Sequence, residues 1–198
     1  MDAFTVLPDV SLNRSGMVSR EFADPGIKSF HPDCGYVHEM PYGYNSDRDD
    51  VMILFREGYG SCTTKNAVIA TLARELALYV HKMIGIYRMT DSLVTGTAAI
   101  LSKYDLPYVP MVHCFLAYDE FRVDLTEGND NGKNGPVDEF LVTKQIGPDI
   151  TEKDEYLLYR DALENDILNR PEMSGIETRT VLRTRSEGIV LLRSKVSH

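Results

Sequence analysis

The chain has no tryptophan and only three cysteines among its 198 residues. Three cysteines are too few, and odd in number, for a disulfide framework, so we expect a reducing compartment and at least one free thiol. No apolar run approaches the ~20 residues that a membrane-spanning helix needs. The first residues, Met1 to Phe4, carry no basic segment and open no long apolar stretch, so we expect no secretory signal. These absences together predict a cytoplasmic protein.

Positive charge is also scarce. The chain has 21 lysines and arginines against 30 aspartates and glutamates, which gives a formal net charge of −9. This balance argues against a nucleic-acid partner, because a nucleic-acid binder needs a basic face to neutralise phosphates. It equally argues against docking on an anionic membrane. The 43% hydrophobic content is ordinary for a globular protein and is enough for one domain with a sizeable core.

The most informative residues surround one cysteine. Residues 57–65 read Glu-Gly-Tyr-Gly-Ser-Cys-Thr-Thr-Lys, and a helical pattern follows directly. Cys62 therefore lies where a glycine-containing loop becomes the first turn of a helix. Free backbone N–H groups and the positive end of the helix dipole both favour a thiolate there. Gly58 and Gly60 would let the backbone approach a substrate closely.

The helix is predicted from Ser61 or Cys62 to about Met83. Its apolar stripe recurs at threes and fours: Val68, Ile69, Leu72, Leu76, Val80 and Met83. Gly85 would end it. The same pattern places His81 on this helix, about 28 Å along it from Cys62, which is too far for the two side chains to react together.

A hairpin is predicted downstream, with a strand at about residues 111–118, a turn at Asp119-Glu120 and a returning strand at residues 121–125. A two-residue turn puts His113 and Asp124 on one face as diagonal neighbours, roughly 7–8 Å apart at the backbone. A three-residue loop would put them on opposite faces. The same alternation turns Cys114 away from His113, so we expect Cys114, like Cys34, to lie in the core.

Cys62, His113 and Asp124 are the parts of a cysteine-nucleophile triad. In this interpretation His113 takes the thiol proton, Asp124 holds the imidazole, and Cys62 attacks an acyl carbon to give a thioester. The backbone N–H of Cys62 is the first oxyanion donor. Weak candidates for the second donor are Asn45, Tyr42 and Tyr44. The reaction requires no cofactor, and its substrate would be a peptide or another amide.

These motifs resemble the core of the transglutaminase-like superfamily, whose members are relatives of papain-type cysteine proteases. The residues that carry the resemblance are Gly58-Tyr59-Gly60-Ser61-Cys62, His113 and Val123-Asp124-Leu125-Thr126. In that family a glycine-rich turn delivers the cysteine at a helix N-terminus, one strand brings the histidine, and the next brings the aspartate in an Asp-x-Thr setting.

The resemblance covers residues 29–127 and implies an α+β fold in which the nucleophile helix packs on an antiparallel β-sheet. It also implies that Cys62, His113 and Asp124 form the catalytic triad of a protease- or amidase-type enzyme. Family members often carry a tryptophan soon after the histidine and another before the aspartate. This chain has Phe115 and Phe121 in those neighbourhoods, which argues against a tryptophan-dependent substrate groove.

The flanking segments carry less information. We expect residues 1–28 to be an N-terminal arm, 29–40 a short helix, and 127–136 a polar loop with almost nothing to bury. Thr151 and Asp154 resemble a capping box that opens a helix to about Asn169, before Pro171. Residues 176–196 read as mixed strand or helix. The C-terminal extension, residues 137–198, could cap the groove, set specificity or form a homodimer.

Two other functions are compatible with the sequence. The same fold could serve as a non-catalytic module that binds peptides or proteins, with the triad present but the groove closed. His31, Cys34 and His38 also have a spacing reminiscent of zinc ligands, although Pro32 and Gly35 interrupt them and no fourth ligand is evident.

Overall fold

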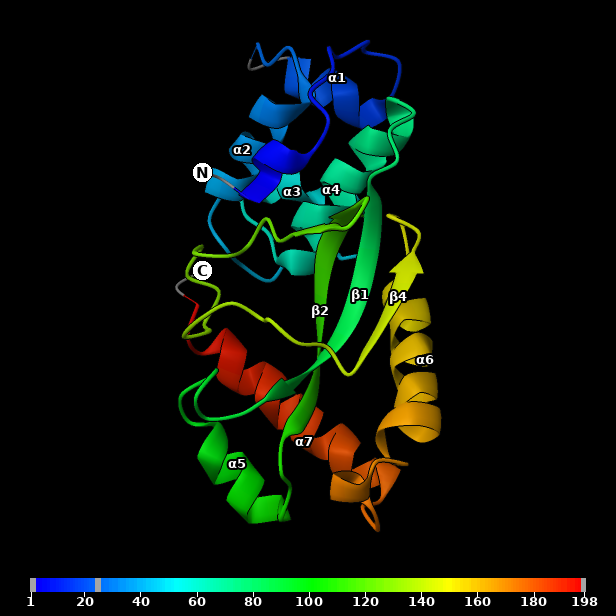
Figure 1. Ribbon diagram of the computed structural model, residues 1–198. Coiled ribbons are helices and arrows are strands. Elements are labelled where there is room, and N and C mark those ends of the chain that lie inside the picture. Colours follow the sequence, from blue (N-terminus) through cyan, green and yellow to red (C-terminus); the bar gives the residue numbers. More distant parts are fainter. Residues whose placement is uncertain (1–2, 24–25, 197–198) are drawn as a thin grey trace.

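The computed structural model describes residues 3–23 and 26–196. These residues fold as α+β, with seven α-helices and one four-stranded antiparallel sheet. The strands lie in the order β3-β2-β1-β4. Figure 1 shows β2, β1 and β4 side by side. Their bounds are β1 His81–Met89, β2 Val109–Tyr118, β3 Phe121–Val123 and β4 Val142–Ile146. Because β4 pairs with β1, part of the C-terminal extension belongs to the same sheet as the predicted hairpin.

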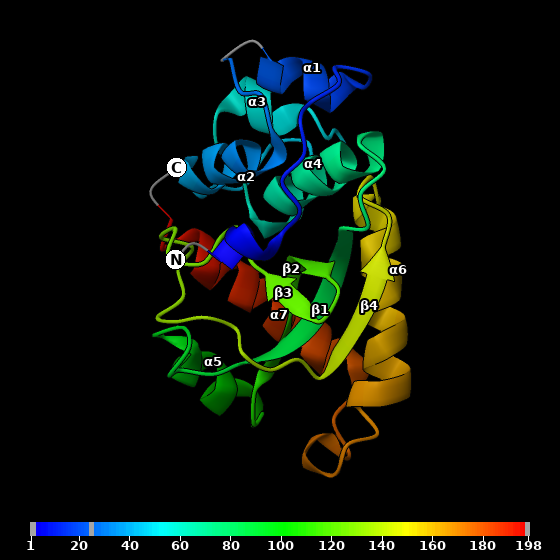
Figure 2. The same ribbon diagram turned by 45° about the horizontal axis from the view of Figure 1, so that its top comes forward.

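The helices gather around the two ends and one side of this sheet. They are α1 Met17–Ala23, α2 Phe30–Glu39, α3 Ile53–Glu57, α4 Cys62–Glu75, α5 Thr97–Tyr104, α6 Glu152–Ala162 and α7 Thr178–Arg193. A 3-10 turn precedes them at Ala3–Val6, and short irregular helices follow α6 at Leu163–Ile167 and Pro171–Met173. Figure 2 shows α1 to α4 together at one end of the sheet and α6 running beside β4.

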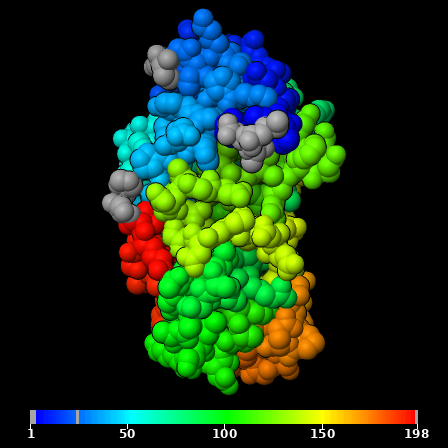
Figure 3. All heavy atoms as spheres, turned by 60° about the vertical axis from the view of Figure 1, so that its left-hand side comes forward, coloured from blue at the N-terminus to red at the C-terminus, as the bar shows by residue number. Residues whose placement is uncertain are grey.

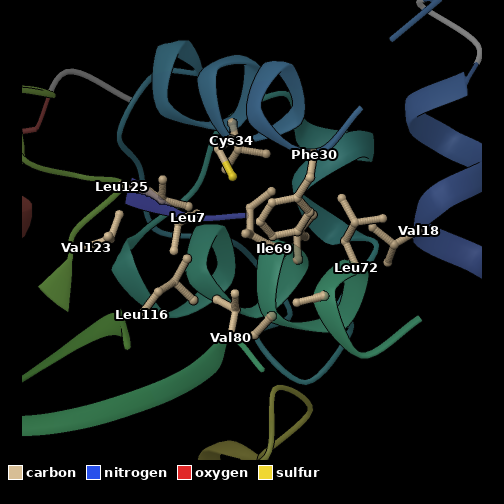
Figure 4. Close-up of a cluster of buried hydrophobic side chains, with 14 of the residues drawn as sticks. Leu7, Val18, Phe30, Cys34, Ile69, Leu72, Val80, Leu116, Val123 and Leu125 are labelled. Carbon is tan, nitrogen blue, oxygen red and sulfur yellow. The ribbon is translucent and has the colours of Figure 1, made fainter. Parts of the chain in front are cut away.

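The largest apolar cluster joins the N-terminal helices to the sheet. Phe30 and Cys34 of α2 meet Ile69 and Leu72 of α4, with Leu116 of β2 on the sheet side (Figure 4). Cys34 is fully buried in this cluster, which confirms that it is a core residue. The helix expected at residues 29–40 is confirmed as α2. Burial of this apolar surface anchors α4, and with it Cys62, against the sheet.

The predicted extent of the nucleophile helix is wrong at its C-terminal end. The helix stops at Glu75, and Ala77 adopts the left-handed conformation with φ 56°. The Leu78 N–H then donates to the Ala73 carbonyl at 2.8 Å, which closes the last turn. Val80 stays in the core but leaves the helix, and the chain continues into β1, where nine residues pair with β2. His81 therefore begins a strand rather than lying on the helix.

The two-residue turn of the predicted hairpin is confirmed, but the returning strand is shorter than the predicted residues 121–125, because β3 ends at Val123. Tyr118 pairs with Phe121 and Leu116 with Val123, so Asp119 and Glu120 form a two-residue turn. Asp119 has φ 48°, in the left-handed region that Asp tolerates and that such turns require. Asp124 follows directly after β3, and its side chain contacts His113 of β2.

The C-terminal segments resolve into helices. Thr151 caps α6, its hydroxyl accepting from the Asp154 N–H at 3.1 Å, which confirms the expected start. Residues 178–193, within a stretch read as mixed strand or helix, form α7. On the face shown in Figure 3, the yellow-green residues that follow β3 lie between the N-terminal segments and α5. None of the described helices combines the length and apolar character needed to cross a bilayer.

Candidate active site

Cys62 is the first residue of α4, as the sequence predicts. The Ser61 N–H donates to the Thr64 hydroxyl at 3.0 Å, and that hydroxyl donates to the Asn45 side-chain oxygen at 2.6 Å. These bonds fix the turn that precedes the helix. The N–H groups of the first helical residues, Cys62 included, have no acceptor within the helix and face the space before it. Cys62 as a residue is only 8% exposed, and it lines a cavity.

His113 and Asp124 are in direct contact. The Nε2 of His113 lies 2.6 Å from Oδ2 of Asp124. The other carboxylate oxygen, Oδ1, accepts from the Thr126 N–H at 2.8 Å and from the Thr126 hydroxyl at 2.7 Å. Both oxygens are thus held, and the carboxylate binds the Nε2–H of the ring. Thr126, the last residue of the Asp-x-Thr pattern, thus holds the carboxylate of Asp124 in place.

The remaining ring nitrogen of His113 points elsewhere. Its Nδ1 is buried and has no hydrogen-bond partner among the described residues. His113 and Cys62 both line one cavity of about 130 Å³. Asp124 does not line that cavity, because it lies behind the imidazole. The structure therefore arranges the three residues in series, with the imidazole between the carboxylate and the cavity that holds the thiol.

The surroundings of Cys62 favour its thiolate. A hydrogen bond with the Cys114 thiol, together with the charges of His113 and Lys133, holds the pKa of Cys62 well below its ordinary value, although burial opposes this. Cys114 is fully buried, which confirms the core prediction. The prediction missed the contact between this core thiol and Cys62. All three cysteines are free.

The imidazole is stabilised as a cation. Burial lowers the pKa of His113, but the negative charges of Cys62 and Asp124 outweigh burial and Lys133 and raise the pKa to about 9. Burial raises the pKa of Asp124, but the charge and hydrogen bond of His113 and the bonds from Thr126 hold it far below its usual range. These shifts in pKa favour the thiolate of Cys62, the imidazolium of His113 and the carboxylate of Asp124.

A neighbouring aromatic side chain fixes the orientation of the imidazole. Phe140 stacks on the His113 ring with centroids 6.5 Å apart and planes 9° apart, and on Phe115 at 4.9 Å. Gly85 pairs with His113 across β1 and β2, and a methyl group at Gly85 would overlap the Phe140 ring. Gly85, which the sequence suggested as a helix stop, lies inside a strand and makes room for Phe140.

The tyrosines around the cavity bear on the second oxyanion donor. Tyr42 and Tyr44 line the cavity, as does Tyr87, which the sequence did not single out. The Tyr87 hydroxyl is buried and has no hydrogen-bond partner among the described residues. Burial, with smaller contributions from Cys62 and Tyr44, raises the pKa of Tyr87, so its hydroxyl keeps its proton and can donate. Asn45 is a poorer candidate.

The Asn45 amide is already committed. Its Nδ2 donates to Glu57 at 2.9 Å and to the Tyr59 carbonyl at 2.8 Å. Both hydrogens are used in holding the turn before Cys62, so the amide stabilises the loop and is not free to bind an oxyanion.

The loop after Asp124 holds a lysine at the site. Lys133 lines the cavity with Cys62 and His113. Burial lowers the pKa of Lys133, against the attraction of the Cys62 and Asp124 charges. Asparagines pin this loop: the Asn131 amide donates to the Thr126 carbonyl at 2.8 Å and its oxygen accepts from the Lys133 N–H at 3.0 Å. The sequence predicted the loop but not these anchors, whose only local signal is the run of asparagines.

The other three histidines among the described residues make contacts away from the cavity. The His31 ring contacts the Leu7 carbonyl, and His38 Nδ1 lies 3.1 Å from the Leu125 carbonyl. His81 lies 3.2 Å from Gln145 at the far end of β1. No group of three or more histidine, cysteine or acidic side chains placed to hold a metal ion occurs in residues 3–23 and 26–196. The structure thus does not support the spacing of His31, Cys34 and His38 as a zinc site.

The site therefore combines the thiol of Cys62 at the start of a helix with the imidazole of His113, which the Asp124 carboxylate holds. A small cavity lies beside them and is bounded on its far side by α7. No protein-family model, curated protein or solved structure matches the chain in the comparisons made.

Proposed function

We propose that the protein is a cysteine-nucleophile hydrolase or acyl-transferase that acts on amide bonds. The observation that carries the proposal is the 2.6 Å contact between His113 and Asp124, with the opposite ring nitrogen unpartnered beside the cavity of Cys62. An imidazole bound in this way has one tautomer and one orientation, and both suit proton exchange with a thiol.

The chemistry follows from the positions of these atoms. The Cys62 thiolate attacks the carbonyl carbon, and the carbonyl electron pair moves to oxygen. The oxyanion is stabilised by the Cys62 backbone N–H and the Tyr87 hydroxyl. Its collapse breaks the C–N bond, and the leaving amine takes a proton from Nδ1 of His113. A thioester remains on Cys62.

The second half of the cycle releases the acyl group. His113 Nδ1 takes a proton from water or from an incoming amine as that nucleophile attacks the thioester. Collapse expels the Cys62 thiolate and frees an acid or a new amide. The rate should rise with pH as the Cys62 thiol ionises, well below its ordinary pKa. It should fall as His113 loses its proton at a pKa of about 9.

The arrangement also supports the resemblance to the transglutaminase-like superfamily. A helix-start cysteine, a histidine on the second sheet strand and an Asp-x-Thr after the hairpin occur in the expected order. We propose a papain- or transglutaminase-like core on this basis. The two phenylalanines near the family's tryptophan positions differ in role, because Phe115 stacks on Phe140 whereas Phe121 is largely exposed. Three free cysteines fit a reducing compartment such as the cytoplasm.

A thiol-reactive ester tests the proposal without knowledge of the natural substrate. p-Nitrophenyl acetate should release a burst of p-nitrophenol equal to the enzyme concentration, with the acetyl group on Cys62 by mass spectrometry. His113→Ala should lose the burst, because Nδ1 no longer takes the thiol proton. His81→Ala is the matched control, since His81 lies at the far end of β1 and should leave the burst unchanged.

Alkylation distinguishes the enzyme from the alternative, a non-catalytic binding module. Iodoacetamide at about pH 6 should label Cys62 far faster than Cys34 and Cys114. Burial alone would slow the other two, so the decisive result is that His113→Ala slows the labelling of Cys62. If the labelling of Cys62 is slow and independent of His113, and no acetyl-enzyme forms, the binding module is the correct interpretation.

A further inference from the structure

The cavity of Cys62 is basic although the chain is acidic. Its lining includes four cationic side chains, Arg48, Lys133, Arg185 and Arg193, in a protein whose net charge is −9. The acids that face the same cavity are Glu152 and Glu155. Positive charge is therefore concentrated at the one place where the sequence has a reactive thiol.

One of these cations is neutralised within the protein. Arg48 lies 2.8 Å from Glu155 and 3.8 Å from Glu152, and it also donates to the Thr63 hydroxyl at 3.2 Å. Both cavity acids are thereby engaged with Arg48. Its role is to join α6 to the start of α4, and its charge is not available to a ligand.

The other three cations have no ion-pair partner among the described residues. The Arg185 guanidinium lies 4.6 Å from the centre of the Tyr159 ring, and its Nε is buried without a hydrogen-bond partner. Arg193 lies 4.9 Å from the centre of the Tyr44 ring. Aromatic faces orient a guanidinium and leave its N–H edge free for an anion.

Lys133 and Arg185 are partly buried and make no ion pair, whereas Arg193 is exposed. Partial burial of a cation that makes no ion pair is costly, so this site is suited to an anion brought by a ligand. The volume of about 130 Å³ limits that ligand portion to a compact group. The planar fork of arginine matches a carboxylate in two parallel hydrogen bonds.

We propose that Lys133, Arg185 and Arg193 form a subsite for a carboxylate carried by the amide substrate close to the bond that is cleaved. This inference rests on the proposed function and names its substrate class: an amide of a small acid, or of an acidic residue, rather than a neutral or cationic one. Arg185 and Arg193 reach the subsite from α7, and Lys133 reaches it from the loop that follows Asp124.

Two alkylating reagents of equal size test the subsite. Iodoacetate and iodoacetamide both alkylate sulfur through their methylene carbon and release iodide, but only iodoacetate is an anion. An isolated thiolate repels iodoacetate, whereas a cationic subsite should bind it. We expect Cys62 to react about tenfold faster with iodoacetate, with saturation at high reagent concentration and loss of the preference in high salt.

Variants locate the effect. Arg185→Gln and Lys133→Gln should each lower the iodoacetate-to-iodoacetamide rate ratio several-fold, with folding checked by circular dichroism. Arg183→Gln is the matched control, because Arg183 lies on the same helix but is exposed and does not line the cavity. If the ratio in the unmodified protein equals that of an exposed thiol, or if Arg183→Gln lowers it as much as Arg185→Gln, the subsite is refuted.

The two proposals fail in different ways. Slow labelling by both reagents, independent of His113, refutes the proposed function. Fast labelling by iodoacetamide without a preference for iodoacetate refutes the subsite alone. Protection then identifies the anion. N-acetylglutamate should slow the labelling of Cys62, whereas neutral N-acetylglutamine should not. Stronger protection by inorganic phosphate than by N-acetylglutamate would overturn the carboxylate assignment.

Discussion

The two sides of the cavity that Cys62 and His113 line are built in different ways. One side comes from the start of α4 and from β2, and it carries Cys62 and His113. The other comes from α7 and the loop after Asp124, and it carries the unpaired cations. The first side is positioned by local rules: a helix start, and the alternation of side chains along a hairpin. The second is positioned by long-range packing and by side-chain hydrogen bonds.

The difference indicates a division of labour. Local geometry fixes the reacting atoms tightly, since a helix start and a two-residue turn leave little freedom. The second side brings recognition groups from far along the chain, where they could vary without moving the thiol or the imidazole. The comparison predicts that changes on the first side abolish chemistry and that changes on the second side alter substrate preference or stability.

Asp124→Asn should have the largest effect on the acylation burst. It removes the negative charge beside His113 but keeps the size and shape of the side chain. The asparagine oxygen would stay on the two Thr126 donors, and its NH2 group would face Nε2 and could not accept from the imidazolium. The burst rate should therefore fall by about 10³–10⁴-fold. The loss of the Asp124 charge should also lower the pKa of His113 from about 9, which moves the alkaline limb of the pH–rate profile towards neutral pH. Both are measured with the p-nitrophenyl acetate assay across pH.

Asp119→Asn is the control for this variant. Asp119 lies in the hairpin turn with φ 48°, a conformation that asparagine adopts readily, and it is exposed. The hairpin and the burst should both survive. A normal burst in Asp124→Asn would show that the Asp124 carboxylate only closes the turn. The proposed catalytic role of Asp124 would then be wrong.

Tyr87→Phe should have an intermediate effect. The hydroxyl has no protein partner among the described residues, so its removal should leave the free energy of unfolding unchanged or slightly raised. The burst rate should fall by about 10²-fold if the hydroxyl donates to the oxyanion. Urea unfolding and the ester assay on one sample measure the two quantities.

Tyr108→Phe gives the opposite pattern and serves as its control. Tyr108 is buried, and its hydroxyl lies 3.4 Å from Glu172, away from the cavity. Its removal should cost stability slightly and leave the burst intact. If Tyr87→Phe leaves the burst unchanged, Tyr87 is not the second oxyanion donor, and Tyr42 and Tyr44 are the remaining tyrosine candidates.

The sequence was sufficient for the His113–Asp124 contact because one assumption, a two-residue turn at Asp119-Glu120, determines which side chains share a face. It was sufficient for Cys62 because glycines and a helical pattern flank it. It failed at the end of α4, where the apolar spacing of Leu72, Leu76 and Val80 continues past the helix. The pairing of β1 with β2 overrides that spacing.

Other features of the site had no local signal at all. Tyr87 and Cys114 are ordinary strand residues until the register places them beside Cys62. Arg185 and Arg193 lie more than a hundred residues along the chain from Cys62. The sequence pattern around them does not indicate whether the segment is a strand or a helix. Such residues are identified by tertiary packing, which a single sequence pattern does not encode.

Asn129→Ala should have the smallest effect on the burst. It tests whether Asn129 holds in place the loop that carries Lys133. The Asn129 oxygen accepts from the buried ammonium of Lys65 at 2.6 Å, and its amide donates to the carbonyls of His38 at 3.0 Å and Met40 at 3.2 Å. Lys65 would keep only the two backbone carbonyls. We expect the free energy of unfolding to fall by about 2 kcal/mol, measured in urea.

The same variant should lower the iodoacetate preference of Cys62 a few-fold, because Lys133 belongs to the loop that Asn129 ties down. Asn134→Ala is the matched control: that amide bonds Ser92 and Thr95 at the exposed surface and should matter little. If stability falls but the iodoacetate preference is unchanged, Asn129 stabilises the fold without positioning Lys133. The preference would then depend on the arginines of α7. Loss of the burst itself would contradict the division of labour, because the two sides would then no longer be independent.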